Sequence, residues 1–420
     1  MTRLLNVNNY HYRRGGSEVV YLEHALMMEG RGFECGYFSM RHPRNEPTPW
    51  SRYFIDEIEF GHEYSLTEKL AMAGKVVWSF EARAKLARLL DAFPADIVHL
   101  HCIYHHHSPA ILSLFSERGI PAVMTAHDLK IACPNYKMRT HDGPCERCRD
   151  GSVWNVVRHR CVQNSLAASA VVAVESALHR ALGTWRRHLA AIVCPSQFFV
   201  DKFVEWGWPR DRFVHVPNWV DAEHFEPGFE PGGYAFSFGR LVLDKGRATL
   251  IRAAHAAALP VKLAGTGPDE AALRALAAEL DADVEFLGYR SGVTLHDAVR
   301  GAGCVVLASE LYENAPMMLL EAMALGKPVV GARIGGIPEV IDEDGTGWLF
   351  ASGSVEALAE RLAAVKAMPD ASLVVMGRAA RAHVEQHFSR SRYLQAMLDL
   401  YAHVGVRLPI TAAAGLRVTV

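Results

Sequence analysis

The chain has 420 residues, 50% of them hydrophobic, and its 44 basic and 46 acidic side chains leave a formal net charge of −2 at pH 7. This length exceeds one ordinary hydrophobic core, so we expect two domains. The near-neutral charge argues against a nucleic-acid partner. The first residues lack the apolar segment of a signal peptide, and no apolar run is long enough to span a bilayer, so we expect a cytoplasmic protein.

In the first half of the chain, strand-like runs alternate with helical patterns such as 17–30 and 109–119. Alternation of this kind is typical of a parallel sheet that is covered by helices on both faces. The strand-like runs are residues 4–9, 33–39, 96–102, 122–128, 191–196 and 213–218.

The second half repeats this alternation more regularly. Two such series predict an α/β protein with two doubly wound, Rossmann-like domains that face a cleft. Pro and Gly cluster in residues 218–234, which predicts domains at 1–220 and 221–385, with a last helix at 386–408 that returns toward the first domain. The strand-like runs are 234–240, 261–265, 284–288, 304–309 and 327–332, and the helical stretches are 248–257, 268–280, 293–302 and 316–326.

The segment 309–326, SELYENAPMMLLEAMALG, combines a loop after a strand with an apolar helix. Asn314 can cap this helix, and Pro316 suits its first turn. The free amide groups near Ala315 and Met317 would form an anion site built from backbone alone. Glu321 lies on the second turn, where its carboxylate could accept hydrogen bonds from a vicinal diol such as a ribose. A partly exposed structural glutamate is the alternative.

The segment GRLVLDKG places Arg240 and Lys245 in the loop after the first strand of the second domain. An Arg fork and a Lys point charge suit a diphosphate, whereas a solvated basic pair is the alternative. The next loop, AGTGPDE, contains Gly265 and Gly267, which allow a flexible turn. In the turn LGYRSG, backbone groups near Tyr289 and Arg290 could meet the edge of a base.

The order of these motifs, GR…KG, then GTG, then Glu313 and Glu321 with seven residues between them, then GGIPE, resembles the retaining glycosyltransferases of family 4, which have the GT-B fold. The resemblance implies that Arg240 and Lys245 neutralise the diphosphate of a nucleotide sugar and that Glu321 holds the ribose. Glu313 and the amides after it would hold the donor sugar and the phosphate. No catalytic divalent metal is expected. Asn314 stands where many relatives have glycine.

The resemblance also implies a function. The protein would transfer a hexosyl group from a nucleoside diphosphate sugar to a glycan or polyprenyl-linked acceptor in surface polysaccharide synthesis. The first domain would serve the acceptor and the second would bind the nucleotide sugar. A nucleotide-sugar epimerase of the same fold and a non-catalytic scaffold are the alternatives.

Two segments of the first half extend the resemblance. Gly15 and Gly16 follow the first strand, and their amide groups could meet a phosphate or a sugar; a plain turn is the alternative. His127, at the end of another strand, resembles the family histidine that contacts the donor sugar, although a structural histidine is common at such a place. Several histidines in residues 101–107 could line the acceptor side.

An insert around residues 133–190 carries Cys133, Cys145, Cys148 and Cys161. A Cys-x-x-Cys pair with one more Cys on each side is a four-thiolate pattern for structural zinc; unrelated reduced thiols and a disulfide are the alternatives. The insert leads into a helix that carries Trp185. With three nearby arginines, Trp185 could rest on the anionic inner face of a membrane, or these residues could form a solvated helix end. The arginines are Arg180, Arg186 and Arg187.

Overall fold

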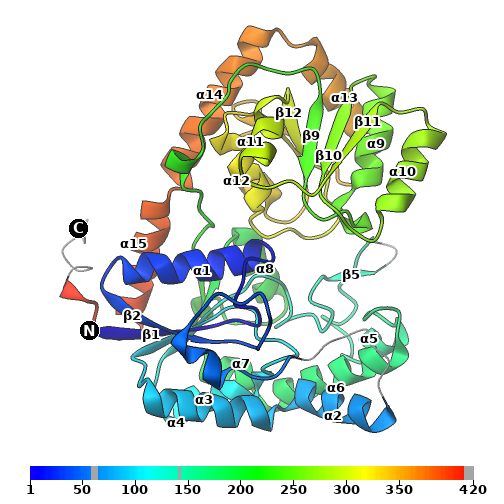
Figure 1. The fold of residues 1–420 in the computed structure, drawn as a ribbon. Coiled ribbons are helices and arrows are strands. Elements are labelled where there is room, and N and C mark those ends of the chain that lie inside the picture. The colour runs from blue at the N-terminus through cyan, green and yellow to red at the C-terminus, as the bar shows by residue number, and fades with distance from the viewer. Residues whose placement is uncertain (58–64, 141–142, 411–420) are drawn as a thin grey trace.

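The computed structural model describes residues 1–57, 65–140 and 143–410, and it contains two six-stranded parallel sheets, which confirm the predicted pair of Rossmann-like domains. Figure 1 shows the two domains one above the other, with the first domain below. Most strands are short runs of Val, Ile, Leu, Phe and Ala that are buried along their whole length, as expected for strands covered on both faces.

The first sheet has the strand order β2-β1-β3-β4-β7-β8. Helices pack on its two faces and form two separate clusters of buried apolar side chains. Its strands are β1 (Thr2–Val7), β2 (Phe33–Phe38), β3 (Ile97–Leu100), β4 (Ala122–Thr125), β7 (Ala191–Cys194) and β8 (Phe213–His215). The helices of this half are α1 (Gly16–Glu29), α2 (Leu66–Val77), α3 (Phe80–Ala92), α4 (Leu112–Glu117), α5 (Asn155–Arg158), α6 (Leu166–Leu182), α7 (Thr184–His188) and α8 (Gln197–Glu205).

The second sheet has the order β11-β10-β9-β12-β13-β14, in which the chain first builds outward from β9 on one side and then on the other. One apolar cluster fills this domain. Its strands are β9 (Ala235–Phe238), β10 (Val261–Ala264), β11 (Val284–Gly288), β12 (Cys304–Leu307), β13 (Val329–Ala332) and β14 (Gly347–Phe350). Its helices are α9 (Arg247–Ala256), α10 (Glu270–Glu279), α11 (Gly292–Arg300), α12 (Met317–Ala324), α13 (Val355–Ala367) and α14 (Asp370–His387).

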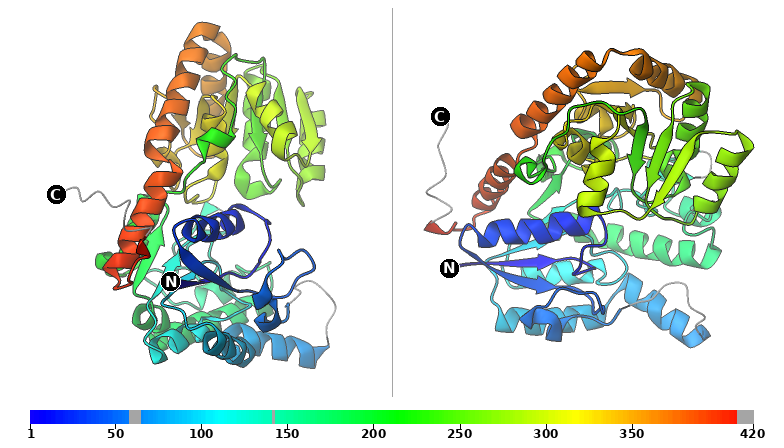
Figure 2. Two further views of the ribbon diagram at one scale, coloured as in Figure 1. Left: turned by 60° about the vertical axis from the view of Figure 1, so that its left-hand side comes forward. Right: turned by 45° about the horizontal axis from the view of Figure 1, so that its top comes forward.

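The last helix, α15 (Arg390–His403), leaves the second domain and packs on the first, as Figures 1 and 2 show. Its buried side chains, among them Tyr393, Met397 and Tyr401, share a core with residues of β1 and α1. The chain therefore crosses between the domains twice, once before β9 and once before α15. The small hairpin of β5 (Arg139–Thr140) and β6 (Gly143–Pro144) belongs to the cysteine-containing insert.

Candidate functional site

Both sheets reverse their direction of growth at one point, between β1 and β3 in the first and between β9 and β12 in the second. In open parallel sheets, ligands bind at such switch points, beyond the carboxyl ends of the strands. The loops that follow these strands are 8–15 and 101–108 in the first domain, and 239–246 and 308–316 in the second. They contain seven of the predicted site residues: Gly15, Arg240, Lys245 and residues 313–316.

Direct contacts join the loops of the two domains. The Asn314 side chain donates to the Ala126 carbonyl oxygen over 2.8 Å and accepts from the Ser196 hydroxyl over 2.8 Å. The Asn218 amide donates to the Ala315 carbonyl oxygen over 2.9 Å. The loop before α12 is therefore bonded to the end of β4 and to the start of α8.

The start of α12 differs from the sequence-based prediction. The N-cap is Pro316, which lies just before the helix, and no side chain in the described part of the chain caps the helix. Asn314 reaches the first domain instead. The amide groups of Met317 and Met318 form none of the backbone hydrogen bonds found among the described residues. The helix thus begins with unpaired N–H groups, as an anion site requires.

The glycine pair of the first domain lies against this helix start. A Cβ atom added to Gly16 would be 3.8 Å from Met317 Cγ, so the start of α1 contacts the start of α12. Gly15 is the N-cap of α1 in extended backbone that any residue can adopt. The structure therefore brings Gly16 to the predicted site. Nothing in the backbone conformation of Gly15 requires a glycine at that position.

The segment GGIPE braces the same loop, a role that the motif alone did not reveal. A Cβ on Gly335 or Gly336 would clash with the backbone of residues 313–314 at 2.1–2.3 Å. The Glu339 carboxylate accepts from the backbone amides of Gln197 and Phe198, each over 2.7 Å. A carboxylate of the second domain therefore caps helix α8 of the first.

The two predicted basic side chains have different surroundings. Lys245 Nζ donates to Glu313 Oε1 over 2.5 Å, and the Ser309 hydroxyl donates to the same oxygen over 2.5 Å. Arg240 is exposed and forms no ion pair or side-chain hydrogen bond within the described residues. The structure thus joins Lys245 to Glu313, which lies eight positions before Glu321, and leaves the Arg240 guanidinium available to an anion.

A third basic residue, Arg247, was missed by the sequence-based reasoning, although it directly follows the KG pair. Its side chain is 1% exposed and donates to the Ser237 hydroxyl and to the Phe238 carbonyl oxygen. Burial lowers the pKa of Arg247 to about 10, so it stays charged at neutral pH. This buried cation lies against Gly239, in the loop 239–246, and adds positive potential there without being exposed.

Gly265 and Gly267 permit close packing rather than flexibility. A Cβ on Gly265, whose φ is +134°, would lie 1.9 Å from the Gly239 carbonyl oxygen. A Cβ on Gly267 would lie 2.0 Å from the Leu241 carbonyl oxygen. The two glycines thus hold the loop after β10 directly against the loop that carries Arg240.

Glu321 is partly buried in α12, and its carboxylate forms no hydrogen bond or ion pair with the described part of the chain. Burial raises the pKa of Glu321 to about 7. An unsatisfied carboxylate in such a place is costly unless a ligand completes its hydrogen bonds. This observation favours the site interpretation over a plain structural glutamate.

The predicted base-binding turn lies beside the glycine loop. Tyr289 is 74% exposed and Arg290 is also exposed. The turn is joined to the loop after β10 by a 2.7 Å bond from the Gly265 amide to the Gly288 carbonyl oxygen. Its backbone is therefore at the same edge of the sheet as Arg240, and its role in binding a base stays a prediction.

The histidines of the first domain separate into two groups. His127 follows β4 and is adjacent to the Ala126 carbonyl that Asn314 binds, so it lies at the contact between the domains. His101 and His107 are fully buried, and His107 bonds to Asn9 over 3.0 Å. The expectation that these two line the acceptor side is therefore wrong. Burial lowers the pKa of His127 to about 4, so its ring is neutral at pH 7.

The four cysteines of the insert are free thiols, and Cys133 and Cys148 are buried. Burial raises the pKa of Cys133 to about 12, and burial and neighbouring thiols raise the pKa of Cys148 and of Cys161. Within residues 1–57, 65–140 and 143–410, no group of three or more His, Cys, Asp or Glu is arranged as metal ligands. Zinc binding by these four residues stays a prediction.

The insert contacts the loops 239–246 and 308–316 directly. Lys137 Nζ pairs with the Asp244 carboxylate over 2.6 Å, and Arg139 pairs with Asp244 over 3.0 Å and with Glu310 over 3.3 Å. In Figure 1, β5 lies between the two domains. The insert thus forms a second connection across the interface, next to Lys245.

Trp185 and the nearby arginines, which we predicted could face a membrane, do not form an exposed group around Trp185. Trp185 is 8% exposed and packs in the core of the first domain. Arg180 donates to the Ala132 carbonyl oxygen, and the Arg186 guanidinium lies 4.9 Å from the Trp208 ring. Among the helices of the described residues, none combines the length and apolar character that crossing a bilayer requires.

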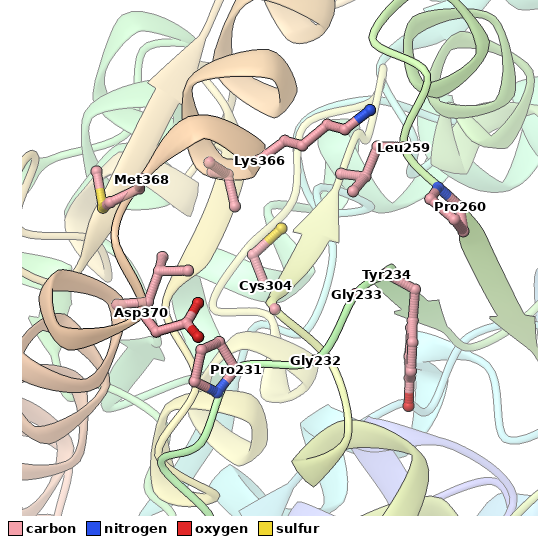
Figure 3. A pocket seen from close by; sticks show the side chains of 13 residues that line it. Pro231, Gly232, Gly233, Tyr234, Leu259, Pro260, Cys304, Lys366, Met368 and Asp370 are labelled. Carbon is pink, nitrogen blue, oxygen red and sulfur yellow. The ribbon is translucent and has the colours of Figure 1, made fainter.

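Figure 3 shows a hollow at the opposite edge of the second sheet, where β9 and β12 begin. Pro231, Tyr234, Cys304 and Asp370 line it. Because ligands of doubly wound sheets bind beyond the carboxyl ends of the strands, this hollow is not the candidate site.

Comparisons with known proteins agree with this geometry. A family model described as Glycosyltransferase Family 4 matches residues 14–224, and one described as Glycosyl transferases group 1 matches residues 220–383. The N-acetyl-alpha-D-glucosaminyl L-malate synthase of Bacillus anthracis is 33% identical over 407 residues, which are 93% of this chain and 94% of that protein.

Other relatives match over a shorter length. The amylovoran biosynthesis glycosyltransferase AmsK of Erwinia amylovora is 28% identical over 211 residues. The match covers 46% of this chain and 52% of that protein, about half of each. Among solved structures, HepE of Anabaena in complex with UDP and glucose has a TM-score of 0.68 at 16% identity, with 96% of this chain and 100% of that chain covered. The family matches and the full-length relative show that the chain is an enzyme of glycosyltransferase family 4, with the GT-B fold.

Proposed function

We propose that the protein transfers a hexosyl group from a nucleoside diphosphate sugar to a hydroxyl of a glycan or lipid-linked glycan in surface polysaccharide synthesis, with retention at the anomeric carbon. The observation that carries this proposal lies at the second switch point, where Lys245 pairs with Glu313 just before α12, and where Arg240 and Glu321 have no side-chain partner among the described residues. Two named similarities support it, a complex of HepE with UDP and glucose and a relative in amylovoran biosynthesis.

The diphosphate would bind between the loop 239–246, which carries Arg240 and Lys245, and the start of α12. Arg240 offers a planar fork, and the free amides of Met317 and Met318 offer backbone donors. Lys245 carries three N–H donors, so it can bind a phosphate oxygen while one donor stays on Glu313. Positive charge at this place stabilises the negative charge that grows on the leaving group.

The ribose would bind to Glu321. With a pKa of about 7, Glu321 is only partly ionised at neutral pH in the unliganded protein. Two hydroxyl groups that donate to the carboxylate favour its ionised form. Donor binding would therefore release a proton from Glu321 near pH 7, which gives the contact a measurable signature.

The Glu313 carboxylate already accepts from Lys245 and from Ser309, so it is held by these donors rather than free to act as a nucleophile. We therefore propose attack from the front face. The acceptor hydroxyl loses its proton to an oxygen of the departing phosphate as the bond to the anomeric carbon forms. The contacts of Asn314 and Glu339 across the interface would keep water out during transfer.

We also propose that no divalent cation is needed, because Arg240, Lys245 and the amides of α12 supply the charge that a metal would otherwise provide. Activity that persists in the presence of a chelator would support this proposal. Activity that returns only with an added cation would contradict it.

A thermal-shift panel of UDP-, GDP- and ADP-sugars, followed by measurement of nucleoside diphosphate release with and without acceptor glycans, tests the function. A shift with one nucleotide and acceptor-dependent release support glycosyl transfer. An epimerised sugar that forms from the donor alone would instead identify an epimerase. No shift with any of them would leave a non-catalytic scaffold.

A further inference from the structure

Three imidazole rings lie in a stack behind the candidate site. The ring centroids of His99 and His101 are 4.6 Å apart with 12° between the ring planes, and those of His101 and His127 are 5.2 Å apart with 21°. His101 Nδ1 is 2.9 Å from His127 Nε2, a hydrogen-bond distance. The stack follows from the register of β3 and β4, in which His99 pairs with Val123, so that the residues just beyond both strands lie side by side.

The far end of the stack is held by the last helix. His99 Nδ1 is 2.6 Å from the Tyr401 hydroxyl and His99 Nε2 is 2.7 Å from the Thr125 hydroxyl, so both ring nitrogens are engaged. The Tyr401 hydroxyl is also 2.8 Å from His24 Nε2. With its ring fixed by these bonds, His99 provides a rigid surface against which His101 stacks.

The bond between His101 and His127 contains one proton. Burial lowers the pKa of both rings, to about 4 for His127, so both are neutral at pH 7 and each carries a single N–H group. Two arrangements of this proton are therefore available. Either His101 Nδ1–H donates to His127 Nε2, or His127 Nε2–H donates to His101 Nδ1.

The surroundings of His101 distinguish these arrangements. His101 Nε2 is buried and has no hydrogen-bond partner among the residues that the structure describes. If His127 donated, His101 would carry its own proton on Nε2 and bury an N–H group without an acceptor. Orphaned buried N–H groups are rare because they forfeit a full hydrogen bond. If His101 donates, only a ring lone pair is left without a partner.

We propose that His101 is a positioning residue that holds His127 in the Nδ1–H tautomer, so that His127 presents an N–H donor at the contact between the domains. His127 Nδ1 forms no hydrogen bond within the described residues. Its N–H can therefore bind an oxygen atom of the donor sugar, and in this form the free nitrogen of the ring cannot serve as a base. The ligand in this inference rests on the proposed function, whereas the tautomer does not.

The test compares two variants of His101 in the full-length protein. His101→Phe keeps an aromatic ring in the stack but removes the donor. His101→Asn places an amide N–H near the position of Nδ1. With ¹⁵N-labelled histidine, the two ring nitrogens of His127 are identified by the signals that disappear in His127→Asn.

We expect a protonated Nδ1 and a bare Nε2 on His127 in the wild type and in His101→Asn. In His101→Phe no donor fixes the proton, so we expect both tautomers of His127 in exchange. We also expect kcat/KM for the sugar donor to fall about tenfold in His101→Phe, as the loss of one well-placed hydrogen bond implies, and to stay closer to wild type in His101→Asn. Thermal midpoints of both variants separate these effects from loss of folding.

A protonated Nε2 on wild-type His127 would overturn the inference, and so would an unchanged tautomer and unchanged kcat/KM in His101→Phe. If His101→Phe does not fold, the wild-type spectrum still decides. Failure of the proposed function would give a different result. No nucleoside diphosphate would be released from any nucleotide sugar, while the His127 tautomer would still be as stated.

Discussion

Replacing Arg240 by alanine removes an exposed basic side chain that has no ion-pair partner among the described residues. Because nothing in the folded protein depends on this side chain, the free energy of unfolding should change by no more than about 0.5 kcal/mol. The effect on catalysis should be much larger. An arginine that contacts the leaving diphosphate makes charge-assisted bonds that strengthen as negative charge develops.

Loss of one such donor costs about 3 kcal/mol in the transition state, which corresponds to a fall in kcat of about 100-fold. Arg240→Lys should recover part of the rate, because it restores the charge but not the planar fork. The assay is release of nucleoside diphosphate under saturating donor and acceptor, with the thermal midpoint measured in parallel.

Arg252→Ala is the matched control. Arg252 is an exposed arginine of α9 in the same domain, and we expect its removal to change neither the rate nor the stability. If Arg240→Ala transfers sugar at the wild-type rate, the assignment of the diphosphate site is refuted. Equal losses in Arg240→Ala and Arg252→Ala would point to a general charge effect instead.

Four further predictions follow from individual contacts. Burial raises the pKa of Glu321 from 4.5 to about 7, so the wild type loses stability as the pH rises from about 4.5 to about 7 and loses little more above that. Glu321→Gln should therefore stabilise the unliganded protein by about 2 kcal/mol at pH 8 and very little at pH 4, while it weakens donor binding. A pH-independent change in the denaturation midpoint would contradict this. Gly265→Ala should lower the thermal midpoint strongly, because its Cβ would lie 1.9 Å from a carbonyl oxygen at a positive φ, whereas Gly233→Ala, with nothing within 4 Å, should not. Asn314→Ala removes both side-chain bonds to the first domain and should raise KM for the donor and increase the radius of gyration measured by small-angle scattering; an unchanged radius and KM would exclude a closing role. If the insert binds zinc, metal analysis should find stoichiometric zinc in the wild type and none in Cys148→Ser. A wild-type protein without zinc would leave the four cysteines as free thiols.

The features that the sequence predicted correctly are local. Short apolar runs are typical of buried strands, and the amphipathic stretches between them have the period of helices that cover a sheet. Their alternation along the chain made the two-sheet fold predictable. The order of GR…KG, GTG and the two glutamates was likewise visible, because each motif directly follows a strand. Some elements had weaker patterns. The strand β14 and the helices α13 and α14 were not among the predicted elements.

The tertiary structure alone decided which side chains meet. Asn314 could have capped its own helix, yet it bonds to Ala126, 188 positions away. Arg247 and Trp185 stand in basic segments, which favoured exposure, but both are buried. His101 reaches His127 only because β3 and β4 lie side by side. Sequence periodicity reports how a segment faces its nearest surroundings, whereas the free energy of a buried polar group depends on partners that folding brings from distant parts of the chain.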